Sequence, residues 1–92
     1  MSGKTVRWSR HAEAALEDRN ISREDVIVTL EEYEFRIPDR LPPNEVLMRR
    51  FIDPGLGKPV LLRVVIHETP LEIVVTVYKA TRMERYLRGL MM

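Results

Sequence analysis

The chain has 92 residues, contains no cysteine and carries a formal net charge of +1. Its length suits one domain with a single core, over residues 1–92. The lack of cysteine excludes disulfides, thiolate metal sites and cysteine nucleophiles, and two histidines, His11 and His67, cannot hold a zinc ion by themselves. We find neither the apolar stretch of a signal peptide nor a membrane-spanning run, so we expect a cytoplasmic protein that needs no metal or cofactor.

The charge is distributed unevenly between the two halves of the chain. Residues 1–45 hold seven Lys or Arg against ten Asp or Glu, a net charge of −3, whereas residues 46–92 hold eight against four, a net charge of +4. A basic half suits a phosphate-rich partner. Basic residues that only solvate strand ends would give the same distribution, so composition leaves both interpretations open.

The first half of the chain predicts a short strand followed by two helices. The strand covers residues 4–8, and Ser9 is placed to cap a helix from Arg10 to about Arg19. Ser22, followed three residues later by an aspartate, predicts the N-cap of a second helix that ends near Glu34. Apolar residues recur at helical spacing at Ala12, Ala15 and Leu16 in the first helix and at Val26, Ile27, Leu30 and Tyr33 in the second. Because the break between them is short, we expect a helical hairpin.

The second half predicts an antiparallel meander and a short terminal helix. Strands are expected at 35–37, 45–53, 60–67 and 71–79, separated by proline and glycine turns. A hydroxyl at Thr81 and a carboxylate three residues later form a capping box, which predicts a helix that starts at Thr81. The fold class is therefore α+β, with the helices covering the apolar face of the sheet.

The alternation of side chains predicts how the last two strands pair. Arg63 shares a strand face with His67, and Tyr78 shares one with Thr76. An even-numbered loop between the strands aligns their apolar faces and places Arg63 opposite Thr76, so that Tyr78 lies on the same face. A one-residue slip would put Arg63 opposite Val75 and bury the charge among aliphatic side chains, so the even register is favoured.

Two segments resemble known families. The stretch WSRHAEAALEDRNISREDV with the later VVTVY is similar to domain-of-unknown-function family 4258, and the matching residues are His11, Arg19, Ile21, Ser22 and Val74–Tyr78. The stretch KATRMER is similar to the end of BrnT toxins, through Lys79, Ala80, Thr81, Glu84 and Arg85. Both groups are related in fold to RelE/ParE toxins. The resemblance therefore implies a RelE/BrnT-like α+β fold, with a short N-terminal strand, a helical hairpin packed on an antiparallel meander sheet, and a short C-terminal helix.

The resemblance also implies a function. BrnT toxins are metal-free ribonucleases that a co-encoded antitoxin neutralises, so we expect a bacterial toxin–antitoxin endoribonuclease that binds RNA, such as mRNA on the ribosome, on the open sheet face. BrnT toxins typically carry Lys-His-Gly between the first two helices, where this chain has Asp18-Arg19-Asn20. Two alternatives stay open: a non-catalytic interaction module on the same fold, and a ParE-like inhibitor of a DNA enzyme.

Metal-free RNA cleavage needs a base, an acid and cations for the developing phosphorane charge. We assign these catalytic roles to His11, Arg63 and Tyr78. His11 begins a helix and can exchange protons near neutral pH, although first-turn histidines are commonly surface residues. Arg63 is placed mid-strand, where a guanidinium is costly unless it is exposed or paired, for example with Glu72. Tyr78 is equally compatible with a half-buried packing role.

The junction between the last strand and the terminal helix predicts a basic edge. We expect the cations to contact RNA phosphates without taking protons; the candidate RNA-binding residues are Lys79, Arg82, Arg85 and Arg49. The chain ends in apolar residues, namely Leu87, Leu90, Met91 and Met92. This tail is either a frayed terminus or an interface for a cognate antitoxin or a second copy in a homodimer.

Overall fold

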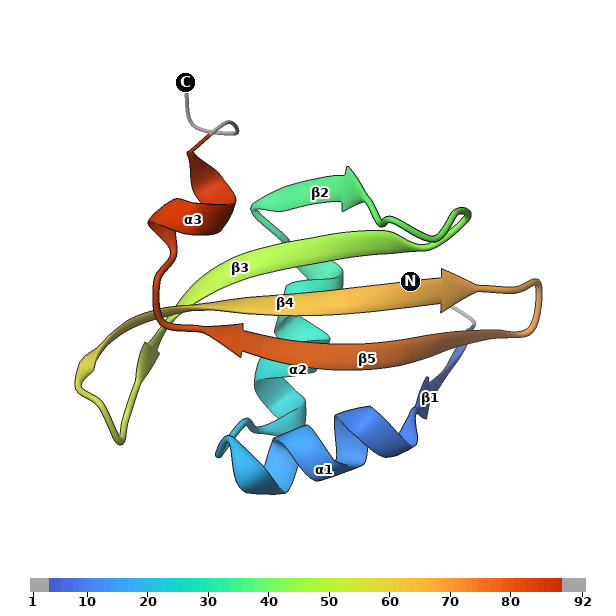
Figure 1. The fold of residues 1–92 in the computed structure, drawn as a ribbon. Coiled ribbons are helices and arrows are strands. Elements are labelled where there is room, and N and C mark those ends of the chain that lie inside the picture. The colour runs from blue at the N-terminus through green and yellow to red at the C-terminus, as the bar shows by residue number, and fades with distance from the viewer. Residues whose placement is uncertain (1–3, 89–92) are drawn as a thin grey trace.

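The computed structural model describes residues 4–88, which contain a five-stranded sheet of order β1-β5-β4-β3-β2 with two helices of nine residues each (Figure 1). The elements in chain order are β1 (Thr5–Trp8), α1 (Arg10–Asp18), α2 (Arg23–Glu31), β2 (Phe35–Pro38), β3 (Glu45–Asp53), β4 (Lys58–Glu68), β5 (Glu72–Ala80) and α3 (Glu84–Leu87). The α+β class and the antiparallel meander are confirmed. Within the described range, no helix is long and apolar enough to cross a bilayer.

Both long helices begin at the predicted caps. The Ser9 hydroxyl accepts the Ala12 N–H at 3.0 Å, and the Ser22 hydroxyl accepts the Asp25 N–H at 3.0 Å. Figure 1 shows α1 running along the β5 side of the sheet and α2 crossing behind the strands, so the two helices of the expected hairpin cross each other. Asn20 makes the turn between them with a positive φ of 52°, a conformation that asparagine tolerates well.

The N-terminal strand pairs in parallel with β5, a partner that the sequence did not specify. Trp8 lies opposite Val75, and the Ser9 N–H donates to the Val75 carbonyl at 3.1 Å. The chain then turns away into α1. In the described part of the chain, residues 76–80 of β5 consequently have no strand beside them on the outer side of the sheet.

The pairing of β4 with β5 differs from the prediction by two residues. Arg63 lies opposite Tyr78, and Thr76 lies opposite Val65. Glu68 pairs with Ile73, so four residues, 69–72, separate the two ends, and the even-numbered loop is confirmed. A shift of two residues leaves every side chain on its expected face. Its consequence is that Arg63 and Tyr78 become direct cross-strand neighbours.

Both faces of the sheet carry buried apolar side chains. On the face toward the helices, the core consists of Ala12, Ala15, Ile21, Val26, Leu30, Leu47, Leu62, Val64, Ile66, Ile73, Val75 and Val77. The opposite face has a smaller cluster of Val46, Met48, Leu61 and Leu87, the last contributed by α3. The second face is therefore partly covered by the end of the chain, which leaves less open surface than we expected.

The predicted helix from Thr81 is wrong. The chain forms a single helical turn of four residues, α3, whose N-cap is Met83 and which has no side-chain cap bond. Burying a leucine stabilises by roughly 1.5–3 kcal/mol, against about 1 kcal/mol for a cap. The packing of Leu87 on the second cluster therefore decides where the turn forms. The remaining apolar tail, Leu90 to Met92, lies outside the described residues.

Candidate functional site

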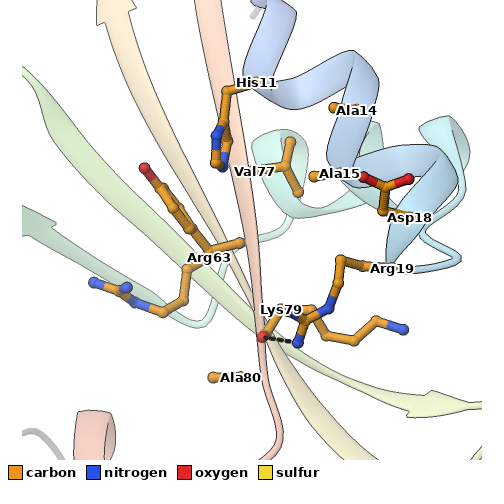
Figure 2. A pocket seen from close by; sticks show the side chains of 10 residues that line it. His11, Ala14, Ala15, Asp18, Arg19, Arg63, Val77, Lys79 and Ala80 are labelled. Carbon is orange, nitrogen blue, oxygen red and sulfur yellow. Dashed lines mark hydrogen bonds between the residues drawn. The ribbon is translucent and has the colours of Figure 1, made fainter.

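A cleft of about 410 Å³ lies between α1 and β5. It opens here because β1 ends at Trp8, beside the middle of β5, and the chain then leaves the sheet as α1. Figure 2 shows the side chains around this cleft, which is lined by His11, Ala14, Ala15, Asp18, Arg19, Arg63, Val77, Tyr78, Lys79 and Ala80. Small alanine side chains on the α1 wall leave this space unfilled.

The structure brings the three predicted catalytic residues together in this cleft. His11 comes from the first turn of α1, Tyr78 from β5 and Arg63 from β4. The rings of His11 and Tyr78 have centroids 4.8 Å apart and planes tilted by 41°. Arg63 is the cross-strand neighbour of Tyr78, and its side chain is half-buried. A histidine, a phenol and a guanidinium from separate elements thus surround one cavity.

Lys79 has a different environment from the basic, RNA-contacting edge that we expected. Its ammonium forms an ion pair with the Asp53 carboxylate, and the two side chains are only 10% and 4% exposed. Asp53 also accepts the N–H groups of Gly55 and Leu56 at 2.8 and 2.9 Å. The Lys79 hydrogen bond, followed by the Leu56 N–H, holds the pKa of Asp53 below its ordinary value. The charge of Lys79 is therefore compensated within the protein.

The other predicted RNA-binding residues lie in two places. Arg82 and Arg85 line a depression of about 200 Å³ next to the cleft, together with Lys79. Arg49 does not line either cavity. It donates to the Glu32 carbonyl at 2.7 Å and lies over the Phe51 ring, 5.6 Å from the centroid, on the helix side of the sheet. Arg49 therefore has a packing role in this structure.

Sequence analysis missed two charged residues of the cleft, Asp18 and Arg19. Arg19 follows α1, and its guanidinium Nη2 donates to the Lys79 carbonyl at 3.5 Å (Figure 2). A signal was present for both, because positions i, i+7 and i+8 share one face of a helix, and His11 is followed at that spacing by Asp18 and Arg19. The spacing could not show that this face is turned toward β5.

The arrangement offers the groups that phosphate chemistry requires. Two guanidinium groups, those of Arg63 and Arg19, can bind phosphate oxygens bidentately. A histidine can accept a proton near neutral pH, and a tyrosine hydroxyl can donate one. Among residues 4–88, no three His, Asp or Glu side chains are grouped so that they could hold a metal ion.

Comparison with known proteins gives one relation. The model of a family described as a domain of unknown function, DUF4258, matches residues 8–79, which include β1 residue Trp8, α1 and all but the last residue of β5. No curated protein and no solved structure matches the chain.

Proposed function

Since the chain belongs to the DUF4258 family, whose description names no reaction, we infer its function from the cleft, and we propose that it is a metal-independent endoribonuclease of a bacterial toxin–antitoxin system. One observation carries the proposal. His11 and Tyr78 have ring centroids 4.8 Å apart in a cleft that Arg63 also lines, and Arg63 is the cross-strand neighbour of Tyr78. These are the base, acid and cation that RNA cleavage needs.

The proposed reaction is an attack by the 2′-oxygen of a ribose on the adjacent phosphorus. His11 takes the 2′-hydroxyl proton while the new oxygen–phosphorus bond forms, and Arg63 stabilises the charge on the phosphorane. The bond to the 5′-oxygen then breaks, and the Tyr78 hydroxyl gives that oxygen its proton. Water carries the proton from His11 back to Tyr78. The products are a 2′,3′-cyclic phosphate and a 5′-hydroxyl, and no proton is gained or lost.

Cleavage of labelled RNA by the purified protein in the presence of EDTA tests this proposal. We expect fragments with 2′,3′-cyclic phosphate ends, and a rate at least about a hundredfold lower in His11→Ala and in Arg63→Ala, because general acid–base catalysis and charge stabilisation contribute on this scale. His67→Ala is the matched control, since His67 lies outside the cleft and bonds to Asn44 at 2.8 Å. Cleavage that stops in EDTA, or a His11→Ala variant as fast as the wild type, would contradict the mechanism.

We also propose a cognate antitoxin, because an unregulated ribonuclease would harm its own cell. Induced expression should slow growth, and Arg63→Ala should relieve this effect while the domain stays folded. Growth arrest with intact RNA would favour the ParE-like inhibitor of a DNA enzyme. Unchanged growth with intact RNA would favour the non-catalytic interaction module.

A further inference from the structure

We propose that Arg19 is a second phosphate-binding side chain of the cleft, and that a single RNA strand crosses the outer edge of β5 with one phosphate at Arg63 and another at Arg19. The identity of the ligand as RNA rests on the proposed function. The crossing path rests on where the two guanidinium groups lie.

The position of Arg19 is set by backbone contacts. Its N–H donates to the Ala15 carbonyl at 2.9 Å, which holds it at the C-terminal end of α1. Its guanidinium donates to the Lys79 carbonyl at 3.5 Å. In a strand, the carbonyls of every second residue point to the same side. The Val75 carbonyl points to the outer side of the sheet, where it accepts the Ser9 N–H. Lys79 follows four residues later, so its carbonyl points to the outer side as well. A guanidinium has five N–H donors, so this contact orients Arg19 and leaves donors for a phosphate.

The two arginines lie on opposite sides of the edge of β5. In Figure 2 the side chain of Arg63 extends to one side of β5 and that of Arg19 lies on the other, with the strand itself between them. A strand of RNA that contacted both guanidinium groups would therefore cross β5 within the cleft that His11 also lines. The alternative path, along β5 toward Arg82, leads into a separate and smaller depression.

On the α1 side of the cleft, Arg19 is better placed than Lys79 to bind a phosphate. The cations that line the cleft are Arg19, Arg63 and Lys79. Lys79 is nine-tenths buried and paired with Asp53, so its charge is already compensated within the protein. Asp18 also lines this wall, and its carboxylate repels a phosphate. The proposal therefore predicts opposite effects from two adjacent residues.

Binding of a 2′-O-methyl oligonucleotide, which lacks the attacking hydroxyl, tests the proposal without cleavage. We expect Arg19→Ala to weaken binding about tenfold at low salt and to lower the slope of log K against log salt by about 0.7, the value for one phosphate contact on a single strand. Asp18→Asn should tighten binding. Arg10→Ala is the matched control, because Arg10 is an exposed arginine of the same helix that does not line the cleft.

Arg19→Gln separates binding from a structural role. Glutamine can still donate to the Lys79 carbonyl but has no charge, so it should bind as weakly as Arg19→Ala while unfolding at the wild-type temperature. Wild-type affinity in Arg19→Gln, or an equal salt slope in Arg19→Ala and Arg10→Ala, would overturn the proposal and leave the cleavage results unaffected. If the variants show these binding effects but the wild-type protein does not cleave RNA, the ribonuclease function is overturned and the binding path is supported. A wild-type protein that does not bind the oligonucleotide would overturn the binding path.

Discussion

At the scale of single residues, the contact between His11 and Tyr78 has two components that can be separated. The rings lie at a distance typical of favourable aromatic pairs, 4.8 Å between centroids, and this packing does not need the phenol oxygen. Tyr78 is 42% exposed, so its hydroxyl can reach a ligand in the cleft. Packing and chemistry therefore reside in different atoms of the same side chain.

Tyr78→Phe should leave RNA affinity almost unchanged and slow cleavage by about a hundredfold, because the ring still packs on His11 while the proton donor is lost. Binding of the 2′-O-methyl oligonucleotide and the single-turnover rate on cleavable RNA measure the two effects separately. Tyr33→Phe removes the same atom from an exposed tyrosine outside the cleft and should behave as the wild type. A wild-type cleavage rate in Tyr78→Phe would remove Tyr78 from the mechanism.

At the scale of elements, one carboxylate connects the segment between α2 and β2 to the neighbouring strand β3. Glu34 lies just before β2, and its N–H donates to the Met48 carbonyl at 2.8 Å. Its carboxylate accepts the Arg50 N–H at 2.8 Å and the Arg50 guanidinium Nη2 at 2.6 Å. The side-chain hydrogen bond to Arg50 lowers the pKa of Glu34 from 4.5 to about 2. The carboxylate thus fixes β2 at the edge of β3.

Protonation of the Glu34 carboxylate at low pH should weaken its contact with Arg50. Because the folded pKa of Glu34 lies below its unfolded value, its contribution to stability is present above about pH 4.5 and is lost as the pH falls toward about 2. Glu34→Gln should therefore lower stability at pH 7 and reduce the loss of stability between pH 4.5 and 2.5, as urea unfolding at each pH would measure. Glu31→Gln is the control, since Glu31 is exposed at the end of α2. Parallel pH profiles of Glu34→Gln and the wild type would contradict the assignment.

At the scale of the whole molecule, the sheet has two apolar faces with very different covers. Two nine-residue helices pack on one face, whereas a four-residue turn, α3, packs on the other. A single turn has no stability of its own. Its position therefore depends on Leu87, which is only 4% exposed, and on the partly buried Met83.

Leu87→Ala should lower the free energy of unfolding by about 2–3 kcal/mol, toward the lower end of the range for buried leucines, because a surface turn can relax into the gap. Urea unfolding at neutral pH measures the change. Leu71→Ala truncates a leucine that is 83% exposed, so its effect should stay within about 0.5 kcal/mol. A Leu87→Ala variant as stable as the Leu71→Ala control would show that α3 is not needed to cover this face.

The sequence by itself determined the elements up to β5, the two serine caps and the faces of β4 and β5, because side-chain alternation and capping are local properties. It also named four of the residues that line the cleft, His11, Arg63, Tyr78 and Lys79. Only the tertiary structure decided the parallel pairing of β1, the two-residue shift that sets Arg63 beside Tyr78, the burial of Lys79 against Asp53, and the place of Arg19. These depend on contacts between residues far apart in the chain, where packing on both faces of the sheet outweighs local preference. The predicted helix start at Thr81 is absent for the same reason, since the burial of Leu87 stabilises the chain more than a cap at Thr81 would.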